Sequence, residues 1–230
     1  MSKENKVIIA LDFKNREEVI NFLSNFNEQL YLKVGMELFY REGIPMIEYL
    51  KKEGHQIFLD LKLHDIPNTV TSAMKNLKDL GIDMINVHCA GGSKMMKDAS
   101  EVFKDTNTKV IGVTQLTSTS QDMLENELKI NLPMEDVVIK YAKLAQDAGL
   151  SGVVCSGWEA KAIHENTSNE FLCVCPGIRL ELSDDDQVRV VTPKNARELG
   201  ANYIVVGRPI TKADNPKEIY QKIEKEFYHE

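Results

Sequence analysis

The sequence has few cysteines and no long apolar run. Its four cysteines, Cys89, Cys155, Cys173 and Cys175, include no Cys-x-x-Cys pair. We therefore expect neither a disulfide framework nor a metal site and interpret them as small buried hydrophobes. No apolar segment approaches the roughly 18 residues of a membrane-spanning helix, and no apolar signal-peptide region follows residues 1–5. These absences predict a cytoplasmic protein without membrane association.

Two further absences concern nucleic acids and nucleotide cofactors. The formal net charge is −7, which argues against a nucleic-acid-binding protein because such proteins usually carry a basic surface. The sequence contains neither a glycine-rich dinucleotide-binding motif nor a P-loop, so nothing supports a bound nucleotide cofactor. A small phosphorylated ligand stays compatible with this charge, because a few cationic groups and backbone N–H groups suffice to bind one.

What the sequence does contain is a regular alternation of strand-like and amphipathic helical segments. We predict strands over residues 7–11, 31–34, 56–63, 84–89, 110–115, 152–155, 171–175 and 203–206. We predict helices over residues 16–27, 36–53, 68–80, 94–103, 134–148, 159–165, 194–199 and 217–227, with an extra helical piece at 121–129. This pattern is typical of a single-domain (β/α)8 TIM barrel spanning residues 1–230. The alternative, a doubly wound open sheet, usually stops at about five or six strands.

The third predicted strand carries an unusual charge pattern. Read with a period of two, its apolar face consists of Ile57, Leu59, Leu61 and Leu63. The opposite face carries Phe58, Asp60 and Lys62, and Asp65 follows where Ile66 and Pro67 end the strand. Because Asp and Lys are seldom buried unless they are paired, this spacing indicates chemistry rather than packing.

Polar residues also end the neighbouring strands, where such a barrel carries its active site. They are Asp12, Lys33, Asn86, His88, Thr117, Arg179 and Arg208. Lys33 can stand beside Asp60, which gives an alternating array of Lys33, Asp60, Lys62 and Asp65 in which opposite charges offset one another. The array favours the protonated form of Lys62, so we expect Lys62 to protonate a carbanion and not to act as an amine nucleophile. The alternative is a salt-bridge network that only closes the barrel.

A phosphate site is predicted at the loops that follow the last two strands. Gly207 lets backbone N–H groups approach a ligand, and Arg208 offers a bidentate guanidinium. The long polar segment 179–192 is typical of a lid, from which Gln187 could reach the phosphate. Trp158 is interpreted as a packing residue at the start of a helix, and His88 as a residue that orients its neighbours.

Taken together, these residues resemble the orotidine 5′-phosphate decarboxylase family in its short bacterial form. The resemblance rests on Asp60-x-Lys62-x-x-Asp65 followed by Pro67-Asn68-Thr69, and it extends over essentially the whole chain. Its other segments are Ala10-Leu11-Asp12, Lys33-Val34-Gly35, Val113-Thr114-Gln115-Leu116-Thr117-Ser118, Pro176-Gly177-Ile178-Arg179 and Val206-Gly207-Arg208-Pro209-Ile210. The Asp-x-Lys-x-x-Asp triplet alone is shared with magnesium-dependent 3-keto-gulonate-phosphate decarboxylases and hexulose-phosphate synthases. The Thr-Gln-Leu-Thr-Ser and Pro-Gly-Ile-Arg segments are similar to the orotidylate branch.

The resemblance implies decarboxylation of orotidine 5′-monophosphate to uridine 5′-monophosphate, the last step of de novo pyrimidine synthesis, without metal or organic cofactor. It implies that Lys62 protonates C6 of the pyrimidine, that Asp60 and the partner subunit's Asp65 flank the leaving carboxylate, and that Lys33 with Asp12 contacts the ribose. A homodimer with shared active sites follows from this assignment.

The resemblance also implies the remaining substrate contacts. Thr117 lies by the pyrimidine, Gln187, Gly207 and Arg208 bind the phosphate, and Arg179 lies nearby. Contacts are implied along the whole segment of Asp60, Leu61, Lys62, Leu63, His64, Asp65, Ile66, Pro67, Asn68 and Thr69, with Thr69 joining from the partner. Two alternatives stay open: a magnesium-dependent sugar-phosphate decarboxylase or aldolase, and a non-catalytic nucleotide-binding barrel.

Overall fold

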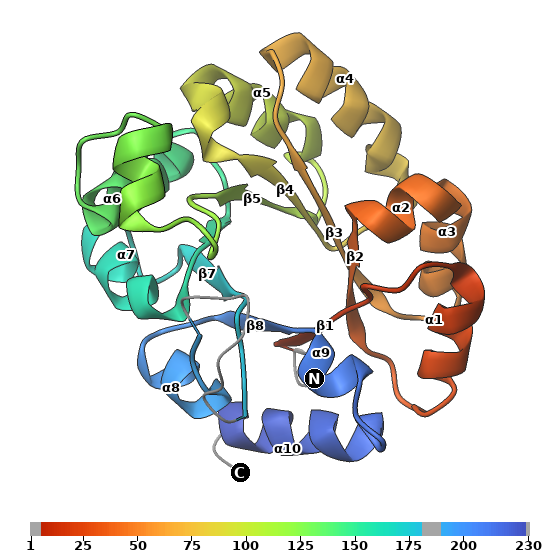
Figure 1. Cartoon of the computed structure of the whole chain (residues 1–230). Coiled ribbons are helices and arrows are strands. Elements are labelled where there is room, and N and C mark those ends of the chain that lie inside the picture. Colours follow the sequence, from red (N-terminus) through yellow and green to blue (C-terminus); the bar gives the residue numbers. More distant parts are fainter. Residues whose placement is uncertain (1–5, 181–189, 229–230) are drawn as a thin grey trace.

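The computed structural model describes residues 6–180 and 190–228. Eight parallel strands close into a barrel in chain order, and β1 pairs with β8 (Figure 1). The strands are β1 (Val7–Ala10), β2 (Tyr31–Gly35), β3 (Gln56–Leu63), β4 (Met84–His88), β5 (Lys109–Val113), β6 (Gly152–Val154), β7 (Leu172–Cys175) and β8 (Tyr203–Val206). The predicted (β/α)8 barrel is confirmed, and every predicted strand agrees with an observed one to within two residues at each end.

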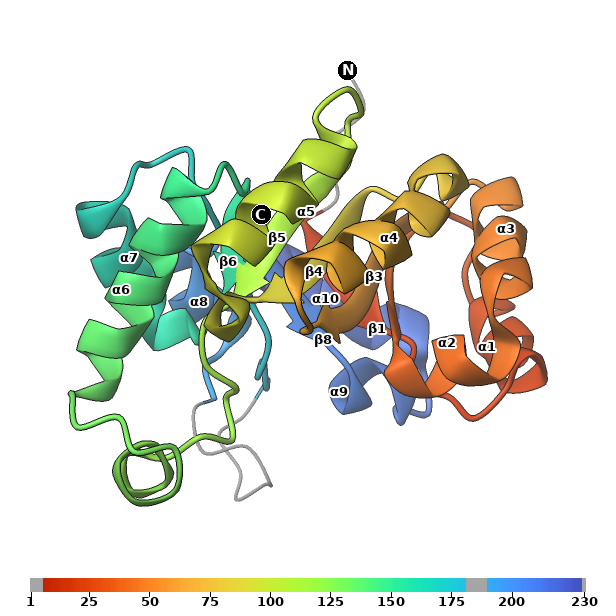
Figure 2. The same ribbon diagram turned by 90° about the horizontal axis from the view of Figure 1, so that it is seen from above.

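Helices surround the barrel on its outside (Figures 1 and 2). They are α1 (Arg16–Leu23), α2 (Met36–Glu42), α3 (Ile44–Lys52), α4 (Pro67–Leu77), α5 (Gly92–Phe103), α6 (Met134–Asp147), α7 (Ala160–Asn166), α8 (Pro193–Glu198), α9 (Arg208–Thr211) and α10 (Pro216–Tyr228). Each helix of the described chain falls short of the length and apolar character that crossing a bilayer requires.

The helical predictions differ from the structure at the segment 36–53 and at the short helix α9. The single helix expected over 36–53 is two helices, because Gly43 adopts a left-handed backbone with φ of +66° and ends α2 before α3 begins. The extra helical piece expected over 121–129 is confirmed: residues 121–127 are helical, and Met123–Glu127 among them form a π-helical turn. The short helix α9, which directly follows β8, was not predicted, because four residues are too few to show a helical period.

Two apolar layers lie on the two faces of the barrel strands. Alternate strand residues point outward into the layer beneath the helices, among them Ile57, Leu59 and Leu61 of β3. The inward-pointing residues form a smaller cluster of Ile8, Ala10, Tyr31, Phe58, Met84, Ile111, Val174, Tyr203 and Val205. This inner cluster fills the barrel and forms the floor of the space at the carboxyl ends of the strands.

Candidate active site

A cavity of about 570 Å³ lies at the carboxyl ends of the strands. Ala10, Phe58 and Val205 of the inner cluster belong to its lining, so the cavity sits directly on the packed interior. Its polar and charged lining residues are Asp12, Lys33, Asp60, Lys62, Gln115, Thr117, Ser118, Arg179, Arg208 and Lys212. Because these residues come from both ends of the sequence, only closure of the barrel brings them together.

The backbone of β3 changes direction at Lys62. Lys62 has φ of +48°, a left-handed conformation that a residue with a Cβ seldom adopts. The pairing of β3 with β4 shifts register between Leu59 and Leu63, around this position. The Oδ1 of Asn86 on β4 accepts a hydrogen bond from the backbone N–H of Lys62 at 2.7 Å. This irregularity re-aims the Lys62 side chain at the strand end, as bulges beside active sites commonly do.

Four charged side chains form an alternating array along one wall of the cavity. Lys33 Nζ lies 3.1 Å from Asp12 Oδ1 and 3.3 Å from Asp60 Oδ2. Lys62 Nζ lies 2.7 Å from Asp60 Oδ1, the same oxygen that accepts a 2.7 Å hydrogen bond from Asn86 Nδ2. The side chains of Asp60 and Lys33 are only 10% and 12% exposed, and that of Lys62 is 29% exposed. Lys62 is thus the more solvent-exposed of the two lysines.

The array stabilises both central charges. Burial alone would lower the pKa of Lys33, but the carboxylates of Asp60 and Asp12 raise it above its usual value. Burial alone would raise the pKa of Asp60, but Lys33, Lys62 and the amide of Asn86 together hold it below its usual range. Asp60 is therefore a carboxylate, and Lys33 an ammonium, at neutral pH.

The predicted composition of the array within one chain is wrong at its end. Asp12, and not Asp65, is the fourth member, because β1 pairs with β2 and places Asp12 beside Lys33. Asp65 is exposed, and its Oδ1 accepts a hydrogen bond from the backbone N–H of Ile66 at 2.6 Å. Among the described residues no ion pair connects Asp65 to Lys62 of the same chain.

The rest of the predicted segment points in several directions. The side chains of Leu61 and Leu63 pack in the outer apolar layer, so the expectation that they contact a ligand is not supported for their side chains. His64 stacks on His88 with ring centroids 5.3 Å apart. Burial, together with the nearby His64 and Lys62, lowers the pKa of His88, which favours its neutral form.

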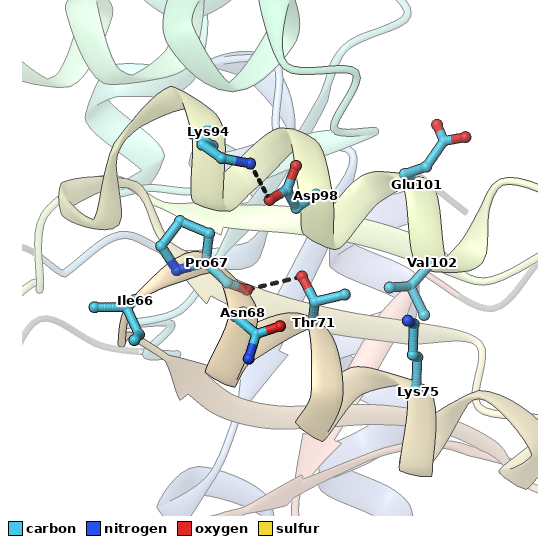
Figure 3. Close-up of a pocket in the computed structure, with 9 residues that line it drawn as sticks. All are labelled: Ile66, Pro67, Asn68, Thr71, Lys75, Lys94, Asp98, Glu101 and Val102. Atoms are coloured by element: carbon cyan, nitrogen blue, oxygen red, sulfur yellow. Dashed lines mark hydrogen bonds and ion pairs between the residues drawn. The ribbon is translucent and has the colours of Figure 1, made fainter.

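A second cavity lies outside the barrel, between α4 and α5. Ile66, Pro67 and Asn68 line it rather than the main cavity, together with residues of both helices (Figure 3). Ile66 is 67% exposed, and Thr69 is exposed as well. The segment that follows Lys62 therefore turns outward, away from the site of its own chain.

The main cavity is also lined by cationic side chains that lie outside the array. Thr117, Arg179, Gly207 and Arg208 all line this cavity, and so does Lys212 at the end of α9. Sequence analysis missed Lys212 because α9 itself was not predicted. Gln187 lies outside the described residues.

The cavity thus has two chemically different groups of lining residues. The charge array holds two lysines and two aspartates whose formal charges cancel, and the cationic end consists of Arg179, Arg208 and Lys212. Cationic side chains suit a dianionic group such as a phosphate. An ammonium held on a carboxylate, as Lys62 is on Asp60, suits proton delivery to a developing carbanion. Within residues 6–180 and 190–228, no three His, Cys, Asp or Glu side chains are arranged to hold a metal ion.

Comparisons with known proteins show the family to which the chain belongs. A family model described as Orotidine 5′-phosphate decarboxylase / HUMPS family matches residues 5–223. A protein named Orotidine 5′-phosphate decarboxylase from Bacillus cereus is 55% identical over 229 residues, which cover 96% of each chain. A protein of the same name from Bacillus cytotoxicus is 54% identical over 235 residues, covering 99% of this chain and 98% of the relative. The crystal structure of Orotidine 5′-phosphate decarboxylase from Lactobacillus acidophilus superposes with a TM-score of 0.88 at 45% identity, covering 97% and 99% of the two chains.

Proposed function

Because the chain belongs to the orotidine 5′-phosphate decarboxylase / HUMPS family, we propose that it converts orotidine 5′-monophosphate to uridine 5′-monophosphate and CO₂ as a carboxy-lyase of pyrimidine biosynthesis. The observation that carries the proposal is the joint presence of near full-length relatives with this name and the Lys33, Asp60 and Lys62 array at the cavity wall. The relatives favour this reaction over the magnesium-dependent sugar-phosphate alternative, because both carry the orotidylate name.

Lys62 delivers the proton in this mechanism. When the carboxylate leaves C6 as CO₂, the bonding electron pair stays on C6, and the ammonium of Lys62 donates the proton that completes the C–H bond. Asp60 holds that ammonium by its 2.7 Å ion pair, so the donor is oriented before the bond breaks. A carboxylate placed against Asp60 is repelled, and that repulsion disappears as the carboxylate leaves, which favours the transition state over the bound substrate.

The remainder of the site binds the parts of the substrate that do not react. Lys33 and Asp12 contact the ribose, and Thr117 lies beside the pyrimidine. The cationic end binds the 5′-phosphate through Gly207 and Arg208, with Arg179 nearby. Gln187 is assigned to the phosphate from the sequence alone. Binding energy gathered at the phosphate can then be used to hold the pyrimidine against Lys62.

A homodimer with shared sites completes the proposal. Asp65 and Thr69 are exposed in the single chain and turn away from their own cavity, so a second copy can receive them. Ile66 between them exposes an apolar side chain, and the groove between α4 and α5 continues directly from it (Figure 3). Covering this exposed apolar surface is a common feature of subunit interfaces. A cytoplasmic location, expected from the sequence, stays a prediction.

The reaction is tested by incubating the purified protein with orotidine 5′-monophosphate and following the formation of uridine 5′-monophosphate. Turnover that survives exhaustive EDTA treatment eliminates the magnesium-dependent alternative. A protein that binds uridine 5′-monophosphate but never turns over orotidine 5′-monophosphate would instead support the non-catalytic barrel.

The shared site is tested by mixing two inactive variants. Lys62→Ala and Asp65→Ala subunits, once exchanged, should form heterodimers with one complete site each, because the lysine and the aspartate come from different chains. About half of the subunit pairs in an equimolar random mixture are heterodimers, so about a quarter of the wild-type sites should recover. No recovered activity after confirmed subunit exchange contradicts the shared site.

A further inference from the structure

Trp158 follows the cavity-lining Cys155 closely in the chain but does not pack in the interior. It lies in the turn Gly157–Glu159, directly after β6, and its side chain is 55% exposed. The turn is capped: the backbone N–H of Ser156 donates to Glu159 Oε2 at 2.8 Å, and that of Trp158 donates to Ser156 Oγ at 3.4 Å. The sequence-based interpretation of Trp158 as a packing residue is therefore wrong.

The turn instead holds the segment that leads into α8. The indole N–H of Trp158 donates a hydrogen bond to the carbonyl oxygen of Val190 at 3.2 Å. Gly157 lies close to Val191, the residue after Val190: a Cβ on Gly157 would stand 2.7 Å from Cγ2 of Val191. Two neighbouring residues of the turn thus contact two neighbouring residues of the segment.

Val191 in turn fixes the backbone of a cavity residue. It forms a parallel bridge with Ile178: its N–H donates to the carbonyl of Gly177 at 3.1 Å, and its carbonyl accepts from the N–H of Arg179 at 3.0 Å. Arg179 is buried and lines the cationic end of the cavity. A continuous series of contacts therefore runs from Trp158 through the Val190–Val191 pair to Arg179.

We propose that Trp158 is a positioning residue for the phosphate end of the cavity, acting through Val190 and Val191 on the placement of Arg179. This inference rests on the proposed function for its substrate but on the described contacts for its geometry. The indole supplies the donor for the Val190 carbonyl oxygen. Phenylalanine would keep much of the ring and lose the donor, whereas alanine would lose both.

The kinetic test compares Trp158→Phe and Trp158→Ala with the wild type. Loss of one partly exposed hydrogen bond that orders a binding group should raise KM for orotidine 5′-monophosphate about threefold to tenfold in Trp158→Phe, with kcat changed less. The inhibition constant of inorganic phosphate should rise by the same factor, and Trp158→Ala should show larger changes in the same direction. An unchanged KM and phosphate inhibition constant in both folded variants overturns the proposal, and so does a fall in kcat alone.

Fluorescence tests the geometry independently of turnover. Trp158 is the single tryptophan of the chain, so emission from the wild-type protein reports on this turn alone. Titration with inorganic phosphate should change the emission with a midpoint that matches the phosphate inhibition constant. If the wild type failed to turn over orotidine 5′-monophosphate, the proposed function would fall, and this titration would still decide the role of Trp158. Phosphate binding, detected by calorimetry, without any change in emission contradicts the coupling.

Discussion

Replacing Lys33 with methionine tests whether the charge array contributes to the free energy of unfolding. Methionine retains an unbranched, mostly apolar side chain and removes the ammonium that lies 3.3 Å from Asp60 and 3.1 Å from Asp12. Asp60 is 10% exposed and keeps Lys62 and Asn86 as partners. The carboxylate would therefore lose one of its two ion pairs while staying buried.

The size of the effect follows from that burial. Removing one partner of a buried ion pair costs about 3–5 kcal/mol, and the two partners that Asp60 retains reduce our expectation to about 2–3 kcal/mol of unfolding free energy. For a chain of this length, one kcal/mol shifts Tm by about 2–4 °C, so Lys33→Met should unfold about 4–12 °C below the wild type at neutral pH.

The loss of stability in Lys33→Met should depend on pH in a specific way. In the wild type the pKa of Asp60 is held below its usual value of 3.8, so its stabilisation is complete above that pH and is lost as the pH falls through the lower, folded-state pKa. In Lys33→Met the pKa of Asp60 moves upward, because burial is then opposed by fewer cations. The stability deficit of the variant should be largest at neutral pH and shrink below about pH 4, where Asp60 takes up a proton.

A matched control separates burial from charge. Lys51 lies 2.8 Å from Asp83, away from the cavity, and both side chains are 28% exposed. Lys51→Met should cost about 1 kcal/mol or less, because water screens the more exposed pair. Thermal or urea unfolding of both variants across pH measures the difference. The reasoning would be refuted if both variants lost the same unfolding free energy, or if the loss in Lys33→Met did not change with pH.

The remaining predictions concern catalysis, phosphate binding and the outer shell. Lys62→Ala should reduce turnover by at least about 10²–10⁴, the usual contribution of a proton donor, while uridine 5′-monophosphate binding by calorimetry stays measurable; turnover within tenfold of wild type contradicts the assignment. Lys212→Gln should raise KM several-fold and weaken the salt dependence of KM, because one cation at the phosphate end is lost; an unchanged salt dependence would place Lys212 outside the binding field. Hydrogen bonds with Cys173 and with two backbone carbonyls raise the pKa of His164 to about 9. Protonated His164 therefore stabilises the folded state below about pH 6.5, and this stabilisation is lost as the pH rises through 9. The Tm difference between the wild type and His164→Gln should narrow over that range.

The regular parts of this protein could be predicted from the sequence because they follow local periods. The alternation along β3 places Leu59 outward and Asp60 inward, as the pattern of two requires. The pairing of β2 with β3 then puts Lys33 beside Asp60. These contacts need only strand periodicity and the rule that sequential strands are neighbours.

The irregular parts could not be predicted, for identifiable physical reasons. Lys62 has a left-handed backbone, and its N–H donates a hydrogen bond to Asn86 on the neighbouring strand β4. No local sequence pattern encodes this contact. Asp12 joins the array because it lies just after β1, which pairs with β2 and so brings Asp12 to Lys33; the charge pattern along β3 alone suggested Asp65. The contact of Trp158 could not be predicted, because its hydrogen-bond partner, Val190, lies 32 residues away along the chain.

The inner apolar cluster determines from which side water and protons can reach the cavity. Tyr31 and Tyr203 meet edge to face in this cluster, with ring centroids 6.1 Å apart, and Phe58 lies on the same floor directly under the cavity. Water and protons are therefore supplied from the mouth, on the side where Lys62 is 29% exposed and Lys33 only 12%. In the proposed mechanism, Lys62 must regain its proton from that same side after the product has left. Product release and reprotonation of Lys62 then use one route, and release comes first.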